Sequence, residues 1–320
     1  MKRKGVVIFA IICVLFGGYT AGIYAQPADI LTRRELEQVE ENSIAIAETV
    51  LKDTGREGQY FIQDMDQVSV YYGNVTEGQE KDAVVAVSFG PQNTVVTVYA
   101  ADGNGYTYVG DMGDFYDVRN IQFIPVSSEG RDVIIIKETA EQAIGGFEVT
   151  DLIRGFFYND EKEFQNVLQT PERIETMWNN EWCDNDLQKD DNTMCRITEE
   201  TEAAWDLDGD PELNISRYQQ YLTLYPEEGQ TLIPPGEEKF TARGRRVVTE
   251  RFYWSDEWRR FILGEAVDTN TGETVAIIEN RDASPYFLAG FQDDAFLIYR
   301  RDGSTDIVEG NTLEWVTPQL

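Results

Sequence analysis

The stretch with the clearest potential for chemistry is an acidic turn, Asp206-Leu-Asp-Gly-Asp-Pro-Glu212. Asp206, Asp208, Asp210 and Glu212 alternate with other residues around a glycine, so a tight turn can aim several carboxylates at one point. Calcium prefers such a set of oxygen ligands. The turn therefore predicts a calcium site. An ordinary acidic turn without metal is the alternative, because Asp and Gly are common in turns.

The same turn resembles the DxDGDGxxE-type turn of the FG-GAP/VCBS repeats, which occur in exported bacterial β-propellers and in the propellers of integrin α-chains. Asp206, Asp208, Asp210 and Glu212 fall on its acidic positions, whereas Pro211 stands where a second glycine is usual. The rest of the chain carries no clean copy of the motif. The resemblance implies a propeller-like fold with calcium at this turn, and it implies no catalytic activity.

A second pair of candidate residues is Cys183 and Cys195, which enclose an acidic loop of low apolar content. In an oxidising compartment we expect them to form a disulfide that pins this loop. The chain-entropy model gives such a bridge roughly 3 kcal/mol of stabilisation. A zinc site is the poorer alternative, because two thiols without histidine or further cysteines make an incomplete ligand set.

Aromatic residues form a third group of candidates, at Trp178, Trp182, Trp205, Phe252-Tyr-Trp254 and Trp258. Exposed tryptophan beside acidic residues would suit stacking on sugars. Alternating aromatic residues on a strand are more typical of a sheet core, so the core interpretation is favoured.

Basic residues gather at Arg243-Gly-Arg-Arg246, Arg251, Arg259 and Arg260. In so acidic a chain, we expect these guanidinium groups to pair with carboxylates of the same molecule. An anionic partner is the alternative.

The composition narrows the range of functions. The 320-residue chain has a formal net charge of -31 and contains no histidine. Such a charge repels polyanions, so no nucleic acid partner is expected and broad contact with anionic lipid is disfavoured. Without histidine, the commonest general base near neutral pH and the usual Ser and Cys protease arrangements are missing. An enzyme would have to work through carboxylates or tyrosine.

The N-terminal residues predict export. Lys2, Arg3 and Lys4 precede an apolar run, and no residue from Gly5 to Ala25 is charged. Residues 1–25 are either a signal peptide, cut after Ala25, or a membrane anchor of sufficient length to span a bilayer. We therefore expect the body to be extracytoplasmic, either secreted or held at the cell membrane by this segment alone.

Residues 26–56 differ from the rest and predict a helical lead-in. Thr32-Arg-Arg-Glu35 has the form of a capping box, and apolar residues recur at near-helical spacing up to Lys52. We expect one amphipathic helix from Arg33 to Lys52. It serves either as a stalk or partner-binding helix, or as a cap packed against the β domain.

Residues 57–320 predict a mainly β domain. Glu80 to Met112 reads as a three-stranded antiparallel meander, with strands at Ala83–Val87, Thr94–Tyr99 and Tyr106–Val109. A similar pattern begins at Arg131, 50 residues after Lys81.

A period of roughly this length predicts a propeller-like array of about five antiparallel meanders. Residues 170–201 interrupt the rhythm and predict an insertion, within which Pro171 to Trp178 is compatible with a short helix.

Together these features predict an extracytoplasmic, membrane-associated, non-catalytic binding or scaffold protein for an unidentified protein or glycan ligand. Two alternatives stay open. One is a glycan-acting enzyme that uses paired carboxylates, and the other is a calcium-stabilised adhesion module. Calcium is the single cofactor that the sequence suggests.

Overall fold

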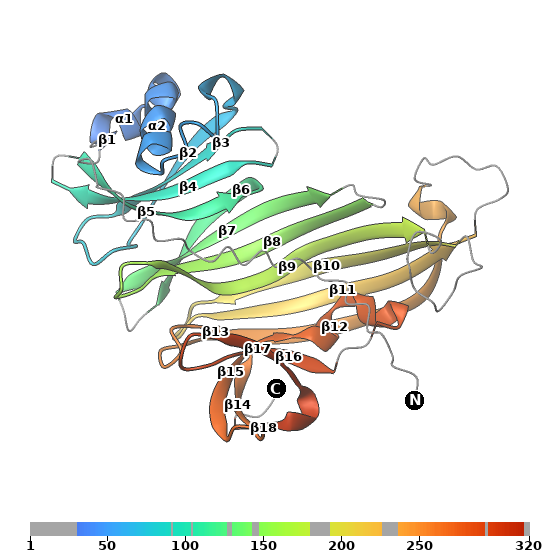
Figure 1. The fold of residues 1–320 in the computed structure, drawn as a ribbon. Coiled ribbons are helices and arrows are strands. Elements are labelled where there is room, and N and C mark those ends of the chain that lie inside the picture. Colours follow the sequence, from blue (N-terminus) through green and yellow to red (C-terminus); the bar gives the residue numbers. More distant parts are fainter. Residues whose placement is uncertain are drawn as a thin grey trace.

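The described part of the chain is mainly β, as predicted. The computed structural model describes residues 31–90, 92–103, 105–126, 130–142, 147–179, 193–225, 236–291 and 294–316. Within these ranges the strands form three antiparallel sheets of five, eight and five strands, called sheets A, B and C here. Figure 1 shows the helices over sheet A, the long strands of sheet B across the middle and sheet C below. The predicted export segment lies outside these ranges.

The strands of sheets A, B and C follow one another in this order along the chain. The helices are α1 (Arg33–Glu37) and α2 (Val39–Asp53). Sheet A contains β1 (Leu31–Thr32), β2 (Gln67–Gly73), β3 (Asp82–Ser88), β4 (Thr94–Asp102) and β5 (Gly105–Phe115). Sheet B contains β6 (Asp117–Val126), β7 (Arg131–Gln142), β8 (Phe147–Tyr158), β9 (Phe164–Asn179), β10 (Met194–Asp206), β11 (Glu212–Leu224), β12 (Thr241–Ser255) and β13 (Arg260–Ile262). Sheet C contains β14 (Gly264–Asp268), β15 (Glu273–Asn280), β16 (Ala295–Tyr299), β17 (Thr305–Glu309) and β18 (Leu313–Trp315). Short 3-10 helices lie at η1 (Ile62–Asp64), η3 (Glu237–Lys239), η4 (Arg281–Ala283), η5 (Pro285–Ala289) and η6 (Gly310–Thr312).

The strands pair almost entirely in sequence order. Strand β1 beside β5 and strand β18 beside β14 are the exceptions among the described strands. The three strands predicted between Glu80 and Met112 are confirmed as β3, β4 and the first half of β5. A propeller arrangement is not confirmed. Propeller blades are sheets of about four strands, whereas the unit that begins at Arg131 lies inside the eight-stranded sheet B as β7 to β9.

The region predicted as one helix from Arg33 to Lys52 forms two helices, α1 and α2. Thr32 caps α1 through the predicted capping box with Glu35, and the chain leaves helical geometry at Gln38, where φ is -118° and ψ is 53°. Strand-facing residues of α2, including Ile46 and Val50, are fully buried in one apolar cluster with residues of sheet A. This packing matches the predicted cap on the β domain.

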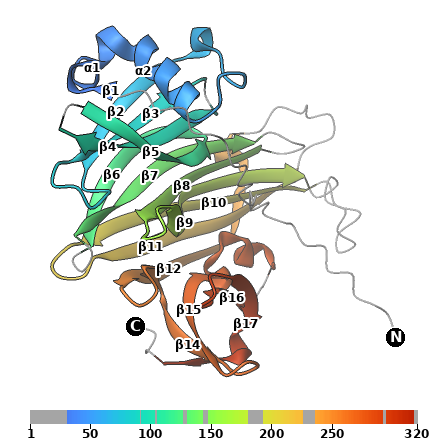
Figure 2. The same ribbon diagram turned by 60° about the vertical axis from the view of Figure 1, so that its left-hand side comes forward.

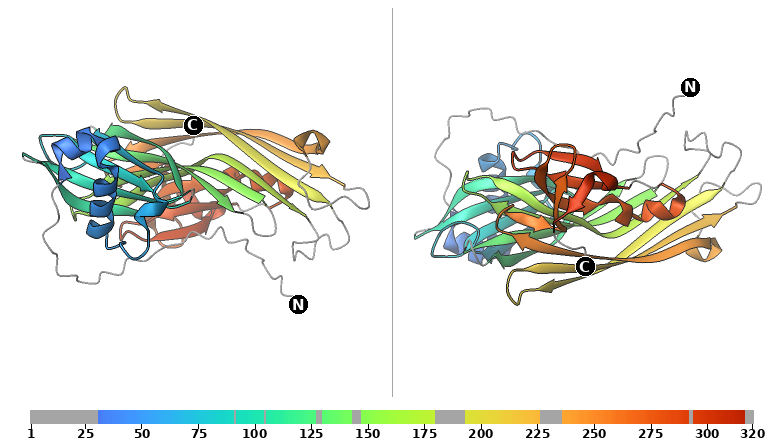
Figure 3. Two further views of the ribbon diagram at one scale, coloured as in Figure 1. Left: turned by 90° about the horizontal axis from the view of Figure 1, so that it is seen from above. Right: turned by 90° about the horizontal axis from the view of Figure 1, so that it is seen from below.

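Sheet A has two buried faces because its side chains alternate. Val85 and Val87 of β3 pack under the helices. Val84 and Ala86 point the other way and pack against residues of β6 to β8 such as Ile134. Sheet A is therefore sandwiched between the helices and one end of sheet B, and Figures 2 and 3 show this layering from other directions.

Sheet B curls so that its two halves share one core. Val133 of β7 and Phe157 of β8 lie in the same apolar cluster as Leu213 of β11 and Trp254 of β12. The rings of Phe157 and Trp254 are 5.2 Å apart, centroid to centroid. We call the face that carries this core the inner face of sheet B, and the opposite face of β9 to β12 the outer face.

The predicted short helix at Pro171–Trp178 is wrong, because these residues lie within the long strand β9. Residues 194–201 likewise belong to β10. Ile174, Met177 and Trp178 are spaced three and four residues apart, which imitates a helix face. Cross-strand pairing with both β8 and β10 overrides that local pattern.

Candidate functional site

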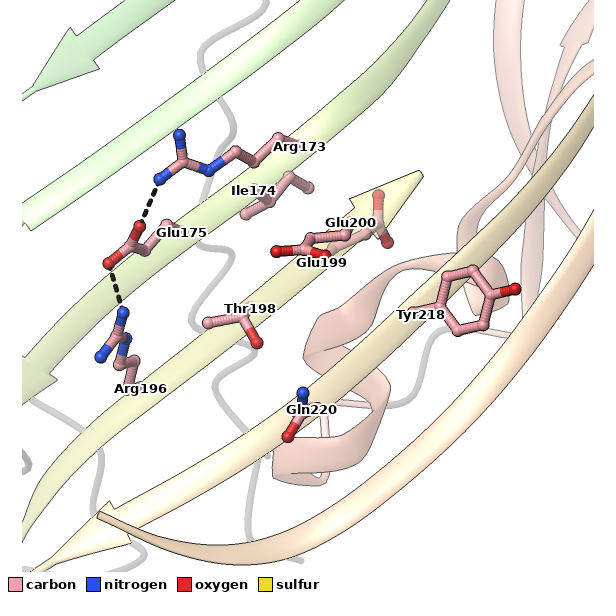
Figure 4. A pocket seen from close by; sticks show the side chains of 9 residues that line it. All are labelled: Arg173, Ile174, Glu175, Arg196, Thr198, Glu199, Glu200, Tyr218 and Gln220. Carbon is pink, nitrogen blue, oxygen red and sulfur yellow. Dashed lines mark hydrogen bonds and ion pairs between the residues drawn. The ribbon is translucent and has the colours of Figure 1, made fainter. Parts of the chain in front are cut away.

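A polar hollow of about 200 Å³ lies on β9, β10 and β11. Figure 4 shows the residues that line it, which are Arg173, Ile174, Glu175, Arg196, Thr198, Glu199, Glu200, Tyr218 and Gln220. We call it the outer-face hollow. All of these residues stand on regular strands of one sheet, so the frame that positions them is rigid.

Strand alternation explains how the outer-face hollow forms. On β10, Ile197 and Glu199 are buried towards the inner face, while Thr198 and Glu200 point to the outer face. The register then sets Thr198 between Glu175 and Gln220 of the neighbouring strands. It sets Glu200 between Arg173 and Tyr218 in the same way. Two parallel rows of polar side chains result.

The charges in the hollow are arranged around Glu175. Its two carboxylate oxygens lie 2.7 Å from Arg173 Nη2 and 2.7 Å from Arg196 Nη2. The Arg173 side chain is 47% exposed and that of Arg196 is 12% exposed. Glu175 therefore fixes two guanidinium groups, and Arg173 keeps much of its donor surface open to solvent.

The two rows continue onto β12. Arg245 lies opposite Gln220, and Val247 lies opposite Tyr218. Tyr218 is 44% exposed and Val247 is 58% exposed, so an aromatic ring and an aliphatic group meet side by side at the surface. Arg245 is exposed and makes no hydrogen bond or ion pair with another described residue. The outer face thus combines an apolar centre with open guanidinium groups at its sides.

Most of the predicted basic cluster contacts groups of the same molecule. The expected carboxylate partners are found for Arg251 and Arg259, whereas three other members contact a hydroxyl group, a backbone carbonyl and an aromatic ring. The partners are Thr223 for Arg243, Ser284 for Arg246, Glu212 for Arg251, Asp160 for Arg259 and the ring of Tyr299 for Arg260. Arg245 is the member of the cluster that lies on the outer face without such a partner among the described residues.

A buried charge network occupies the opposite, inner face. Arg217 Nη1 donates to Glu199 Oε1 at 3.2 Å, and Arg217 Nε donates to Glu250 Oε2 at 2.9 Å. Burial raises the pKa of Glu199 and of Glu250, and the Arg217 charge opposes this rise. Arg217 also donates to Thr170 Oγ1 at 2.7 Å. Both carboxylates are thus committed to protein partners.

The network extends to the segment that covers this part of the inner face. Gln219 Nε2 donates to the Ala283 carbonyl oxygen at 2.6 Å, and Arg246 Nη2 donates to the Ser284 carbonyl oxygen at 2.6 Å. The Arg246 guanidinium also stacks on the ring of Phe287, 4.3 Å from its centroid. The network therefore anchors η4 and η5 to sheet B.

The predicted calcium turn connects β10 to β11. Asp206 lies across the hairpin from Glu212, and its Oδ1 accepts a hydrogen bond from the Asp208 backbone at 3.0 Å. Glu212 Oε2 is 3.6 Å from Arg251 Nη1, and Asp210 lies in the same turn. In the ranges that the structure describes, no three Asp, Glu, Cys or His residues come close enough to hold a metal ion. Calcium binding stays a prediction.

The predicted disulfide also stays a prediction, because Cys183 lies outside the described residues. Cys195 is buried on β10, with its Sγ 3.3 Å from Tyr221 Oη. Among the aromatic candidates, the core interpretation is confirmed for Phe252, Trp254 and Trp258, which are all buried. Trp182 is outside the described residues.

The outer-face hollow was not predicted from the sequence. Its strands β9 and β10 fall in the stretch interpreted as an insertion, which hid the alternation of Arg196, Thr198 and Glu200. A strict period-two pattern of long polar residues there is the signal that could have found it.

Comparison with protein-family models, curated proteins and solved structures finds no match to this chain. The resemblance of the acidic turn to FG-GAP/VCBS repeats therefore stays a prediction. None of the helices in the described ranges is long and apolar enough to cross a membrane.

Proposed function

We propose that this chain is an extracytoplasmic, membrane-associated, non-catalytic binding protein that holds a protein partner on the outer face of β9 to β12. The observation that carries the proposal is the exposed pair Tyr218 and Val247, flanked by the guanidinium groups of Arg173 and Arg245. Aromatic residues and arginine are enriched where proteins bind one another, and they dominate the binding energy there.

The electrostatics of the face support a protein partner rather than a polyanion. Arg173 and Arg196 are balanced by Glu175 and Glu200, so the hollow itself presents both signs of charge. The whole chain, with a net charge of -31, would repel a polyanion at longer range. A partner surface with carboxylates beside an apolar patch would complement Arg245, Tyr218 and Val247.

A binding role is also supported by Glu199 and Glu250, two glutamates whose pKa is raised, because both are bonded to a protein side chain and not directed at a substrate. Glu199 and Glu250 are buried on the inner face, and both bond to Arg217. A glycan-acting enzyme would need such a pair to face a substrate cleft. The extracytoplasmic location is supported by the basic and apolar pattern of residues 1–25.

The proposal is tested by site-specific cross-linking in the native host. A photo-reactive residue at position 247 of the full chain should give a discrete cross-linked product. The same residue at position 307, also on an exposed strand but in sheet C, should not. A combined Tyr218→Ala and Arg245→Glu variant should lose the product, with about a hundredfold weaker binding once the partner is purified. Equal products from positions 247 and 307 would contradict the proposal.

A further inference from the structure

A second hollow, of about 350 Å³, lies beside η1 and the turn between β3 and β4. We call it the aromatic hollow. Its lining combines three aromatic rings with two amides and one carboxylate, from Gln59, Tyr60, Phe61, Asp64, Phe89 and Asn93. It belongs to sheet A and the segment after α2, so it is separate from the outer-face hollow.

The base of the aromatic hollow is rigid. The rings of Tyr60 and Phe89 stack with centroids 4.8 Å apart and planes 13° from parallel. Phe89 is only 5% exposed, and its backbone nitrogen donates to the Asn93 carbonyl oxygen at 2.7 Å. The Asp64 backbone nitrogen likewise donates to the Phe61 carbonyl oxygen at 2.9 Å. These bonds fix the backbone that carries the remaining lining residues.

Three groups of the aromatic hollow are open to a ligand. Phe61 is 60% exposed, so much of its ring surface is open to a ligand. Asp64 and Asn93 are both exposed, and their side chains make no hydrogen bond or ion pair to any other residue in the described ranges. Phe61 offers an aromatic surface, the Asp64 carboxylate only accepts hydrogen bonds, and the Asn93 amide both donates and accepts them.

This combination distinguishes between classes of ligand. A quaternary ammonium group is bound by several ring faces turned towards one point. Here Tyr60 and Phe89 cover one another's faces, which leaves Phe61 as the widely exposed ring of the hollow. A purely apolar ligand would remove water from Asp64 and Asn93 without giving either side chain a hydrogen-bond partner, which disfavours that class of ligand.

We propose that the aromatic hollow binds a neutral sugar unit of a glycan. The C–H face of a pyranose ring packs on Phe61, while Asp64 accepts hydrogen bonds from its hydroxyl groups. Asn93 donates to and accepts from the neighbouring hydroxyls. The volume of about 350 Å³ is in the range of small-molecule sites. The proposal does not depend on the protein-binding role of the outer face.

The test is ligand-observed NMR and calorimetry on the full chain with neutral tetrasaccharides of glucose, N-acetylglucosamine, mannose and galactose, together with choline. At least one tetrasaccharide should bind. Phe61→Ala should weaken that binding by about tenfold or more, as expected from the loss of one stacking surface. Asp64→Ala should weaken it by a comparable factor.

The control variant is Phe291→Ala, which removes another ring, 44% exposed, outside the hollow. It should leave tetrasaccharide binding unchanged. Because Phe61 is exposed, Phe61→Ala should also leave the Tm unchanged, so a loss of binding cannot be ascribed to unfolding. The proposal is overturned if no tetrasaccharide binds, if choline binds in their place, or if Phe61→Ala binds as well as the unaltered chain.

Discussion

At the scale of single residues, Arg217 determines how the inner face of sheet B accommodates charge. Burying a carboxylate is costly unless an opposite charge and hydrogen bonds accompany it. The side chains of Glu199 and Glu250 are almost inaccessible to solvent. The guanidinium group of Arg217 supplies both with the opposite charge and with hydrogen bonds. The three residues come from β10, β11 and β12, so the network also fixes the register of three neighbouring strands.

Removal of this guanidinium should therefore be severe and dependent on pH. We expect Arg217→Met to lower the free energy of unfolding by about 3–5 kcal/mol at neutral pH, because two buried carboxylates lose their partner. The pKa of each of these carboxyl groups in the folded state lies above the ordinary value of 4.5. Such a group contributes its full stabilisation of the folded state at pH values below 4.5. This contribution is lost as the pH rises through the folded-state pKa. The deficit of the variant should thus shrink as the pH falls towards 4.5, where the carboxyls can take up protons.

Urea unfolding at pH 5 and at pH 7 measures this change. Arg245→Met is the matched control, because it removes an exposed guanidinium from the neighbouring strand β12, and it should change stability by less than about 0.5 kcal/mol. An Arg217→Met deficit of equal size at both pH values would contradict the explanation.

At the scale of elements, the packing of sheet A on sheet B depends on close contact at a few positions. Gly73 ends β2, and a Cβ at this position would overlap the ring of Phe123 on β6. Only a residue without a side chain lets these two strands approach so closely.

We therefore expect Gly73→Ala to lower the free energy of unfolding by about 1–3 kcal/mol, through displacement of Phe123. Gly58→Ala is the control, since a Cβ there would meet nothing within 4 Å. Chemical denaturation of both variants decides the point, and equal stabilities would show that sheets A and B are not packed tightly here.

At the scale of the whole molecule, the net charge of -31 acts against the compact state through self-repulsion. Ion pairs such as Arg217–Glu199 are buried, and salt screens them weakly. Salt should therefore relieve the surface repulsion more than it weakens the internal pairs.

We expect the Tm to rise by a few degrees when the salt concentration increases from about 0.01 M to about 0.15 M. Differential scanning calorimetry at pH 7 measures this rise. A Tm that falls with salt would show that exposed ion pairs, rather than repulsion, dominate the surface electrostatics.

Local patterns in the sequence predicted the local structure well. The capping box at Thr32 and the strands between Ala83 and Val109 depend on turn residues, caps and alternation, which act over a few positions. The core location of Trp254 and Trp258 was predictable for the same reason.

The arrangement of the sheets was not predictable in this way. Whether a sheet ends after three strands or continues to eight depends on which strand edges pair with one another. Local sequence patterns do not determine this long-range pairing. The outer-face hollow was missed for this reason. Arg173 and Tyr218 become neighbours of Glu200 only through the pairing of β9, β10 and β11.

The sequential strand order has a consequence for how the chain acquires its structure. Almost every described strand pairs with the strand just before it in the sequence, so most strand pairings are local along the chain and cost less loop-closure entropy than distant ones. We expect the chain to add one hairpin at a time to a growing sheet, in order from the N-terminal strands onward. The edge strand β18 would close on β14 last. Pulse-labelling hydrogen exchange during refolding would reveal this order, with amides of the β7–β8 hairpin protected before those of β18.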